Sequence, residues 1–370
     1  MRNYLDYKIG EEGKRMYDSK VVQEDMNELY TRSELPLELL KNTRVMITGA
    51  NGMLATYLVY FLMYLNCNRD FNIEIYALVR NEKKAEDRFG VFKQNSHFHL
   101  VVGDVCEKLP DNIEKIDYMV HAAGNASPKY ITTDPVGIIE ANVVGTLNVL
   151  EYSKKWNVKR VLFTSTREVY GDVGESVTEI TENNYGVENP TVLRACYPES
   201  KRMAETLLES YRYQFGVDYV TVRIAHSYGP GMNIDQDGRV MSDFISDIVH
   251  RRDIVLKSTG VAERAFCYIT DAISGILIAM LTGESGKAYN LANEEEPMKI
   301  RDVAQLLTQL FQNRNCKVVY KIPEQMNAGY SRIVRKKLST KKLEELGWKC
   351  RITLEEGLKN TVWSFLEEGE

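Results

Sequence analysis

The stretch TRVMITGANGMLATYLVYFLMYL, residues 43–65, predicts a strand, a glycine turn and a buried helix in immediate succession. The strand is Arg44–Thr48, and the helix is Leu54–Leu65. Glycine at the turn lets the backbone bend tightly and approach a ligand, while the start of the helix offers free N–H groups to an anion. The stretch therefore predicts a dinucleotide site formed by Gly49, Asn51, Gly52, Met53 and Leu54.

Short apolar runs alternate with longer helix-like stretches from Thr43 to about Ala225. Further strands are expected at Ile73–Val79, Phe98–Val102, Tyr118–His121, Val161–Thr164 and Tyr219–Ile224. Further helices are expected at Pro135–Trp156 and Ser200–Phe215. This alternation predicts an α/β fold, a Rossmann-type doubly wound parallel sheet.

The chain divides into three expected parts. Residues 1–40 form a helical extension, with helices at Lys20–Tyr30 and Glu34–Leu40, that packs on the domain or on a partner subunit. Residues 41–225 form the dinucleotide-binding domain. Residues 226–370 form mainly a substrate-binding lobe, with some segments returning to the first domain and helices at Ile300–Gln312 and Ser339–Leu346. Ligands of open α/β folds bind at the sheet edge that such a lobe covers.

Composition excludes several classes of protein. The net charge of -5 over 370 residues argues against a nucleic-acid partner. The most apolar run, Met53–Leu65, is too short to cross a bilayer, and the N-terminus lacks the apolar core of a signal peptide. The six cysteines form no CxxC pair, so we expect reduced thiols, no metal site and a cytoplasmic location.

A tyrosine and a lysine four residues apart, Tyr197 and Lys201, stand at the start of an expected helix. That spacing puts both side chains on one face of the helix. Tyrosine, with a pKa of about 10, is a poor base at neutral pH, but a neighbouring ammonium favours the phenolate. Tyr197 can then remove a proton from a substrate hydroxyl while hydride leaves the same carbon.

The end of the expected strand Val161–Thr164 carries two more polar side chains that could meet the substrate. Thr166 could hydrogen-bond the reacting oxygen. Glu168 could act as an acid or base, orient a sugar, or be a solvated loop acid.

The residues after the second and third strands leave the cofactor open between NAD and NADP. An acidic residue usually follows the second strand in NAD-binding folds, whereas Arg80 stands there and suits a 2′-phosphate. Asp104 and Val105 follow the third strand, where the acid could meet the adenine amino group.

Further stretches resemble the extended short-chain dehydrogenases/reductases, the NAD-dependent epimerase/dehydratase family. Within that family the chain is most similar to the UDP-glucuronate decarboxylases, also called UDP-xylose synthases, from about Thr43 to about Leu358. The stretches are HAAGNASPKYITTDP (121–135), NVVGTLNVL (142–150), STREVYGD (165–172), NPTVLRACYPESKRMAETL (189–207), DGRVMSDFI (237–245) and ERAFCYITD (263–271).

The resemblance implies a role for each matched position. Thr166, Tyr197 and Lys201 would form the redox centre, and Glu168 would be the glutamate of the catalytic loop. The centre would oxidise C4 of a uronic acid, the β-keto acid would lose CO2, and the hydride would return. The remaining implied residues are Ala122 and Ala123 at NAD, and Ser127, Arg167, His226, Arg239 and Arg264 at a nucleotide-sugar substrate.

The chain departs from the family pattern at three positions in the substrate pocket. Arg167 stands where serine is usual, His226 where asparagine is usual, and Gly231 where arginine is usual. Arg167 either holds a carboxylate or phosphate directly or narrows the pocket. His226 is interpreted as a polar substitute near the diphosphate rather than as a catalytic base.

Alternative functions follow from these departures. One is an NADPH-dependent reductase, or an epimerase or dehydratase, of a related nucleotide-sugar or sugar-alcohol precursor of a surface polysaccharide. Another is a non-catalytic member, against which the intact Tyr197, Lys201 and Thr166 argue. By analogy with the family, a homodimer is expected through Pro135–Trp156 and Ser200–Phe215.

Overall fold

A seven-stranded parallel sheet forms the centre of the molecule. The computed structural model describes residues 16–110, 112–113, 115–235, 237–322 and 335–366. The strand order is β12-β7-β5-β4-β1-β2-β3, which contains the 3-2-1-4-5 order of a Rossmann fold. The strands are β1 (Arg44–Thr48), β2 (Glu74–Val79), β3 (Phe98–Val102), β4 (Tyr118–His121), β5 (Arg160–Thr166), β7 (Tyr219–Ile224) and β12 (Lys287–Leu291).

The predicted α/β class and most predicted strands are confirmed. Four strands, β1, β3, β4 and β7, have the expected bounds, and β2 begins one residue late. The strand expected at Val161–Thr164 is longer, because β5 continues to Thr166 while it pairs with β7. That extension carries Thr166 to the carboxyl edge of the sheet.

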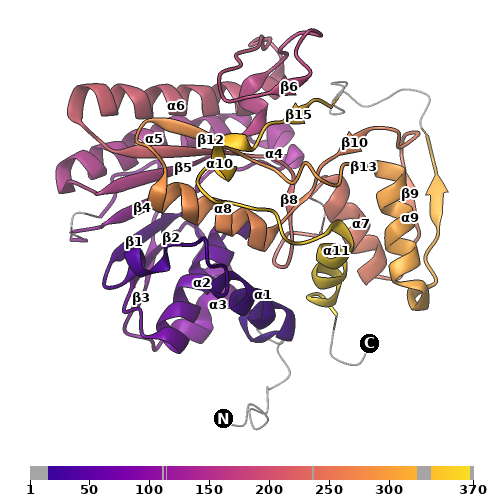
Figure 1. Cartoon of the computed structure of the whole chain (residues 1–370), viewed down its shortest axis with the longest axis horizontal. Helices are drawn as coiled ribbons and strands as arrows, with labels where there is room; N and C mark the ends of the chain where they lie inside the picture. The colour runs from indigo at the N-terminus through magenta and orange to yellow at the C-terminus, as the bar shows by residue number, and fades with distance from the viewer. Residues whose placement is uncertain (1–15, 111, 114, 236, 323–334, 367–370) are drawn as a thin grey trace.

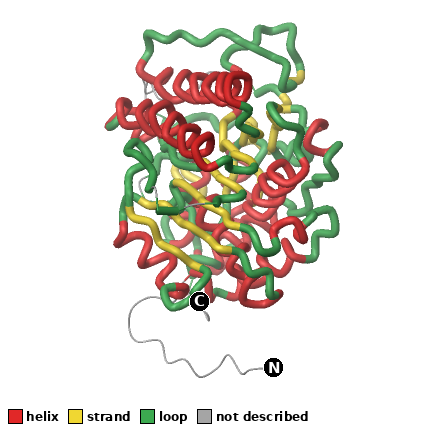
Figure 2. Tube along the Cα trace, turned by 90° about the vertical axis from the view of Figure 1, so that its left-hand side faces the viewer, coloured by secondary structure: helices red, strands yellow, loops and turns green. Residues whose placement is uncertain are grey.

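Helices cover both faces of the sheet (Figures 1 and 2). On one face lie α5 (Pro135–Trp156) and α6 (Cys196–Phe215), which pack on each other. On the other lie α2 (Met53–Arg69) and α8 (Ile269–Thr282). Within the described residues, no helix combines the length and the apolar character that a membrane span needs.

Two of the expected helices are longer than predicted. The helix predicted at Leu54–Leu65 extends at both ends to become α2, whose side chains are buried continuously from Ala55 to Leu65. The helix predicted from Ser200 begins at Cys196, so Tyr197 lies in its first turn.

The predicted end of the strand–helix alternation at Ala225 is wrong. Helix α8 and strand β12 continue the pattern, and β12 pairs in parallel with β7. Helix α8 is buried on nearly every side, so its sequence lacks the period of an amphipathic helix. Strand β12 is the edge of the sheet and is half-exposed at Lys287 and Ala288, so its sequence is not continuously apolar.

Short elements form the lobe beside the sheet (Figure 1). Its helices are α7 (Val240–Val249), α9 (Ile300–Leu310) and α11 (Leu354–Trp363). Its paired strands are β8 (Ser227–Tyr228) with β11 (Cys267–Tyr268), β9 (Ile254–Leu256) with β14 (Val318–Tyr320), and β10 (Glu263–Arg264) with β13 (Met298–Lys299). The remaining short elements are α3 (Glu82–Phe89), α4 (Pro128–Thr133) and β6 (Glu179–Ile180).

The two helices expected in this lobe are corrected. The helix predicted at Ile300–Gln312 ends at Leu310, after which a 3-10 turn follows. The helix predicted at Ser339–Leu346 is too long: β15 (Lys337–Leu338) pairs with β6, and a short helix, α10 (Lys341–Glu344), follows it. Division of the chain at residues 41, 225 and 226 remains a prediction.

The N-terminal extension packs on the Rossmann helices. Helix α1 (Lys20–Tyr30), predicted with these bounds, contacts α2 and α8. The helix predicted at Glu34–Leu40 is wrong, because only a 3-10 turn at Leu37–Leu40 forms after Pro36, which has no N–H to donate. Residues 1–15 of the predicted extension lie outside the described part of the chain.

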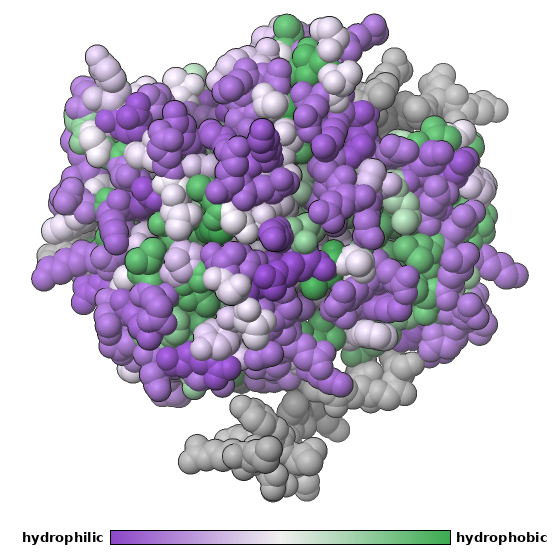
Figure 3. Space-filling model, in the orientation of Figure 1, coloured by the Kyte–Doolittle hydropathy of each residue, from purple (hydrophilic) through white to green (hydrophobic). Residues whose placement is uncertain are grey.

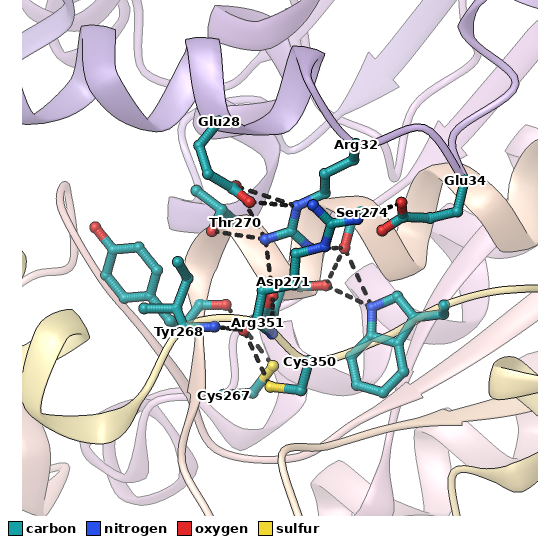
Figure 4. Close-up of polar contacts among 12 residues, drawn as sticks. Glu28, Arg32, Glu34, Cys267, Tyr268, Thr270, Asp271, Ser274, Cys350 and Arg351 are labelled. Atoms are coloured by element: carbon teal, nitrogen blue, oxygen red, sulfur yellow. Dashed lines mark hydrogen bonds and ion pairs between the residues drawn. The ribbon is translucent and has the colours of Figure 1, made fainter.

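A buried ion pair attaches this extension (Figure 4). Arg32, 1% exposed, donates to Asp271 Oδ1 on α8 at 2.8 Å and to both oxygens of Glu28. Asp271 also accepts from the backbone N–H groups of Arg351 and Ile352 at 3.0 and 3.1 Å. One buried carboxylate therefore joins the N-terminal extension, α8 and the C-terminal segment.

We predict that Arg32→Met lowers the free energy of unfolding by about 3–5 kcal/mol, because it leaves Asp271 charged and buried without its cation. Urea unfolding followed by circular dichroism measures the change. Lys20→Met, on the exposed side of α1 in an ion pair with Glu24, is the control and should cost at most about 1 kcal/mol. Equal effects of the two substitutions would contradict the importance of the buried pair.

Candidate active site

The glycine turn lies against the end of the neighbouring strand. Gly49 has a φ of +66°, and a Cβ atom there would lie 2.6 Å from the Cα of Ala123. Both the backbone angle and the space therefore require glycine at this position. The contact brings the predicted cofactor residues Gly49, Ala122 and Ala123 together at the carboxyl edge between β1 and β4.

Polar groups that suit an anion or a nucleotide line this turn. Helix α2 begins at Met53 and Leu54 after Gly52, and no side chain caps its N–H groups. Asn51 donates from Nδ2 to the carbonyl of Asn81 at 2.8 Å, whereas its Oδ1 is buried without a partner. Free N–H groups and an unsatisfied buried acceptor fit a dinucleotide in this groove.

At the end of the site where the adenosine of the cofactor is expected, Arg80 forms an ion pair with Asp104. Arg80 is mostly exposed, and its Nη1 lies 3.6 Å from Oδ2 of Asp104. A hydrogen bond from the Cys106 N–H, with Arg80 nearby, lowers the pKa of Asp104. Val105 is buried against Gly145 of α5, so its side chain faces the core.

The predicted redox residues meet at the start of α6. Tyr197 is 6% exposed, and the Thr166 side chain at the end of β5 lies close enough to act on the Tyr197 hydroxyl. Lys201 is also buried, and its Nζ donates to the carbonyl of Thr164 at 2.8 Å. Burial, reinforced by Glu168, raises the pKa of Tyr197, and burial lowers the pKa of Lys201 to about 7.

Asn142 of α5 adds a polar group that the sequence reasoning missed. Its Nδ2 donates to Ser200 Oγ at 2.9 Å, which joins α5 to α6. Its Oδ1 is buried without a partner. A Cβ at Gly124 would come within 2.6 Å of this oxygen and 3.3 Å of Lys201 Nζ, so both atoms border the same small space.

Glu168 is held by a partner that the sequence reasoning also missed. Arg194 Nη2 lies 3.0 and 3.1 Å from the two carboxylate oxygens. Arg194 is the first residue of the RACYPESKR stretch, so the sequence did draw attention to it. Its distance along the chain from Glu168 does not reveal that the two side chains meet. Burial raises the pKa of Glu168, although the charges of Arg194 and Arg167 partly offset this rise.

Three predicted substrate residues lie on the lobe side. Ser127 donates from Oγ to the carbonyl of Asp237 at 2.8 Å, and the Asp237 carboxylate accepts from Arg239 and from Ser242. The charge of Arg239 acts on Tyr197. Arg264 of β10 donates from Nη1 to the carbonyl of Glu263 at 2.7 Å.

The remaining two, Arg167 and His226, lie in a second group of charges. His226 has a φ of +45°, and its Nε2 is buried without a partner. Burial, with Arg167, Arg264 and Arg335 nearby, lowers the pKa of His226 to about 3, so the ring is neutral near pH 7. Arg335, which the sequence reasoning missed, is held by the carboxylate of Glu294.

No group of three or more His, Cys, Asp or Glu side chains that could hold a metal ion is found among the described residues. The six cysteines are unpaired.

Comparisons with known proteins agree with this geometry. Residues 45–292 match the model of the NAD dependent epimerase/dehydratase family. UDP-glucuronic acid decarboxylase 6 of Arabidopsis thaliana is 34% identical over 318 residues, covering 86% of this chain and 87% of the relative. UDP-glucuronic acid decarboxylase 1 of Danio rerio is 32% identical, covering 92% and 78%.

The fold also has solved counterparts. One is a double mutant of a dTDP-glucose 4,6-dehydratase from Streptomyces venezuelae, determined with NAD bound. Its TM-score is 0.73 at 21% identity, and the match covers 88% of this chain and 98% of that one.

We predict that Gly49→Ala weakens NAD binding at least tenfold, because its Cβ would force the turn away from Ala123. Isothermal titration calorimetry measures the affinity, and thermal unfolding confirms that the variant is folded. Gly174→Ala is the matched control: its φ of +76° imposes the same backbone strain, about 1–2 kcal/mol, but nothing lies within 4 Å of the new Cβ. Equal losses in both variants would show that strain, not the contact, matters.

Proposed function

The chain belongs to the NAD dependent epimerase/dehydratase family, and from that premise we propose that it is a UDP-glucuronate decarboxylase. It would oxidise C4 of the sugar with bound NAD and release the C5 carboxyl group as CO2. The observation that carries the proposal is the burial of Tyr197 beside Thr166 and near Lys201, in a chain 34% identical to a UDP-glucuronic acid decarboxylase.

The residues present fit NAD. Gly49 closes on Ala123, the start of α2 is uncapped, and Asn51 and Asn142 each present a buried oxygen without a partner. When bound, NAD accepts the hydride from C4 and later returns it to the sugar. Asp104 opposite Arg80 would repel a 2′-phosphate, which supports NAD over NADP and weakens the case for an NADPH-dependent reductase.

Tyr197 would remove the proton from the C4 hydroxyl. Burial opposes charge on both Tyr197 and Lys201, so an isolated phenolate in this site is costly. The Lys201 ammonium, one turn further along α6, would supply the compensating positive charge, while its hydrogen bond to Thr164 fixes its position. Thr166, beside Tyr197 at the end of β5, would orient the Tyr197 hydroxyl toward the reacting oxygen.

Decarboxylation then follows from the substrate itself. A carbonyl at C4 accepts the electron pair of the C5–C6 bond, so CO2 leaves and the resulting enolate takes a proton at C5. Glu168, fixed by Arg194 beside Tyr197, supports this step as the candidate proton donor. Its raised pKa favours the protonated form that such a donor needs.

We predict that Tyr197→Phe lowers kcat for release of CO2 from UDP-glucuronate by at least about 100-fold, since it removes the acid–base group without changing the packing. Trapping of labelled CO2 measures turnover, and calorimetry with UDP-glucuronate shows that the site still binds. Tyr213→Phe, on the exposed side of the same helix, is the control and should leave kcat unchanged. Full activity in Tyr197→Phe would contradict the proposed role of Tyr197 as the acid–base residue.

We also propose that the protein is a cytoplasmic homodimer. Helices α5 and α6 expose apolar side chains on their outer surfaces, although the face shown in Figure 3 is mostly hydrophilic. These side chains are Val136, Ile139, Val144 and Leu147 on α5, and Met203 and Phe215 on α6. A contiguous apolar surface on two packed helices suits a self-complementary contact. The six unpaired cysteines suit a reducing compartment.

We predict that the double variant Val144→Glu/Leu147→Glu is a monomer in sedimentation-velocity experiments at concentrations where the wild type is a dimer, because four carboxylates would meet across the contact. Leu39→Glu, an equally exposed leucine on the N-terminal extension, should remain a dimer. A dimeric double variant would place the contact elsewhere.

A further inference from the structure

Arg167 is a cation without a partner in the middle of the site. It follows Thr166 directly, is half-buried, and precedes Glu168, whose carboxylate is held by Arg194. Among the described residues, Arg167 takes part in no hydrogen bond or ion pair. A guanidinium group carries five N–H donors, so its unsatisfied donors can receive an anion from the substrate.

The two carboxylates whose charges act on Arg167, Glu294 and Glu168, are each held by another arginine. Arg264 and Arg335 act electrostatically on Arg167 and on His226, and only Arg335 has a carboxylate partner, Glu294. The second oxygen of Glu294 is occupied by the N–H of Leu338 at 3.0 Å. Glu294 is therefore committed to its own partners, and the positive charge of Arg167 is left for a ligand.

A buried polar atom near Arg167 points to a ligand as well. His226 lies close enough to Arg167 for that charge to act on its ring, and its Nε2 is inaccessible to water and without a partner. Buried polar atoms are normally satisfied, so this nitrogen near Arg167 indicates a ligand that can hydrogen-bond to it.

We propose that Arg167 binds the carboxylate on C5 of the sugar and thereby selects nucleotide uronates over neutral nucleotide hexoses. This inference rests on the proposed function and names a specificity residue for it. Position favours the carboxylate over the diphosphate: Thr166 and Tyr197 face C4, and C5 is the next ring atom. The diphosphate is attached at C1, across the ring, where Arg264 remains available.

The chemistry limits how Arg167 can act. Its charge stabilises the bound carboxylate but not the neutral CO2 that leaves when the C5–C6 bond breaks. An interaction made more strongly with the ground state than with the transition state aids binding and does not accelerate the step. Loss of Arg167 should therefore raise KM and should not lower kcat, unlike loss of Tyr197.

The test compares UDP-glucuronate with UDP-glucose, which differ at C6 alone, on protein that is saturated with NAD and carries Tyr197→Phe, so that UDP-glucuronate is not consumed. Calorimetry on this parent should show at least tenfold tighter binding of UDP-glucuronate, and the further substitutions are made in it. Arg167→Ser should lose that preference and keep its affinity for UDP-glucose. Arg167→Lys should retain part of the preference. Arg301→Ser removes an exposed arginine of the same lobe and should behave as the parent.

Turnover separates this inference from the proposed function. In Arg167→Ser with Tyr197 intact, the KM for UDP-glucuronate should rise at least tenfold while kcat falls by no more than about twofold. Equal weakening of both ligands, an unchanged preference, or a fall in kcat alone would overturn the role of Arg167. If the Tyr197→Phe parent prefers UDP-glucuronate in binding but the wild type releases no CO2, the proposed function fails and the Arg167 assignment stands. Binding of neither ligand would overturn both.

Discussion

The close approach of Gly49 to Ala123 is the constraint on which the site depends. Strand β1 lies between β2 and β4. The chain runs from β1 into α2 on one face of the sheet and from β4 through α4 into α5 on the other, which opens a crevice at this point. The ring of His121 joins the elements around this crevice by hydrogen bonds. Its Nδ1 lies 2.8 Å from Thr48 Oγ1, and its Nε2 lies 3.0 Å from Thr146 Oγ1. Burial lowers the pKa of His121 to about 3, so β1, β4 and α5 are joined by a neutral ring rather than by a charge. Tyr197 and Lys201 therefore lie beside strands and a helix that are joined by hydrogen bonds.

Charges around this crevice are organised as local pairs. Glu168 with Arg194, Asp237 with Arg239, and Glu294 with Arg335 each place a carboxylate against a guanidinium. Pairing keeps each charge in place and limits its influence on Tyr197 and Lys201, whose burial disfavours charge on both side chains. An anionic nucleotide sugar can then bind without breaking these three ion pairs. Among these pairs, a cation such as Arg167 that makes no ion pair with any described residue stands out as a candidate to bind the substrate.

The sequence predicts the centre of the fold better than its edges, for physical reasons. Strands such as β4 are buried on both faces and appear as continuous apolar runs, whereas β12 at the sheet edge mixes Lys287 with apolar residues. Helix α8 was missed because a helix buried on all sides has no polar face to reveal its period. In the site, Thr166 and Tyr197 could be predicted together because strand ends and helix starts meet at one edge. The partners of Glu168 and Glu294 could not, since contacts between loops leave no spacing in the sequence.

The Asp271 carboxylate has a consequence for how the protein is made. Its partners come from residue 32 and from residues 351 and 352, so Arg32 is synthesised long before the backbone groups that complete the site. Arg32 can pair with Asp271 once α8 has formed, whereas the two N–H groups arrive later. A fragment that stops before residue 351 would keep the Arg32–Asp271 pair but would lose two hydrogen bonds to a buried carboxylate, which costs stability.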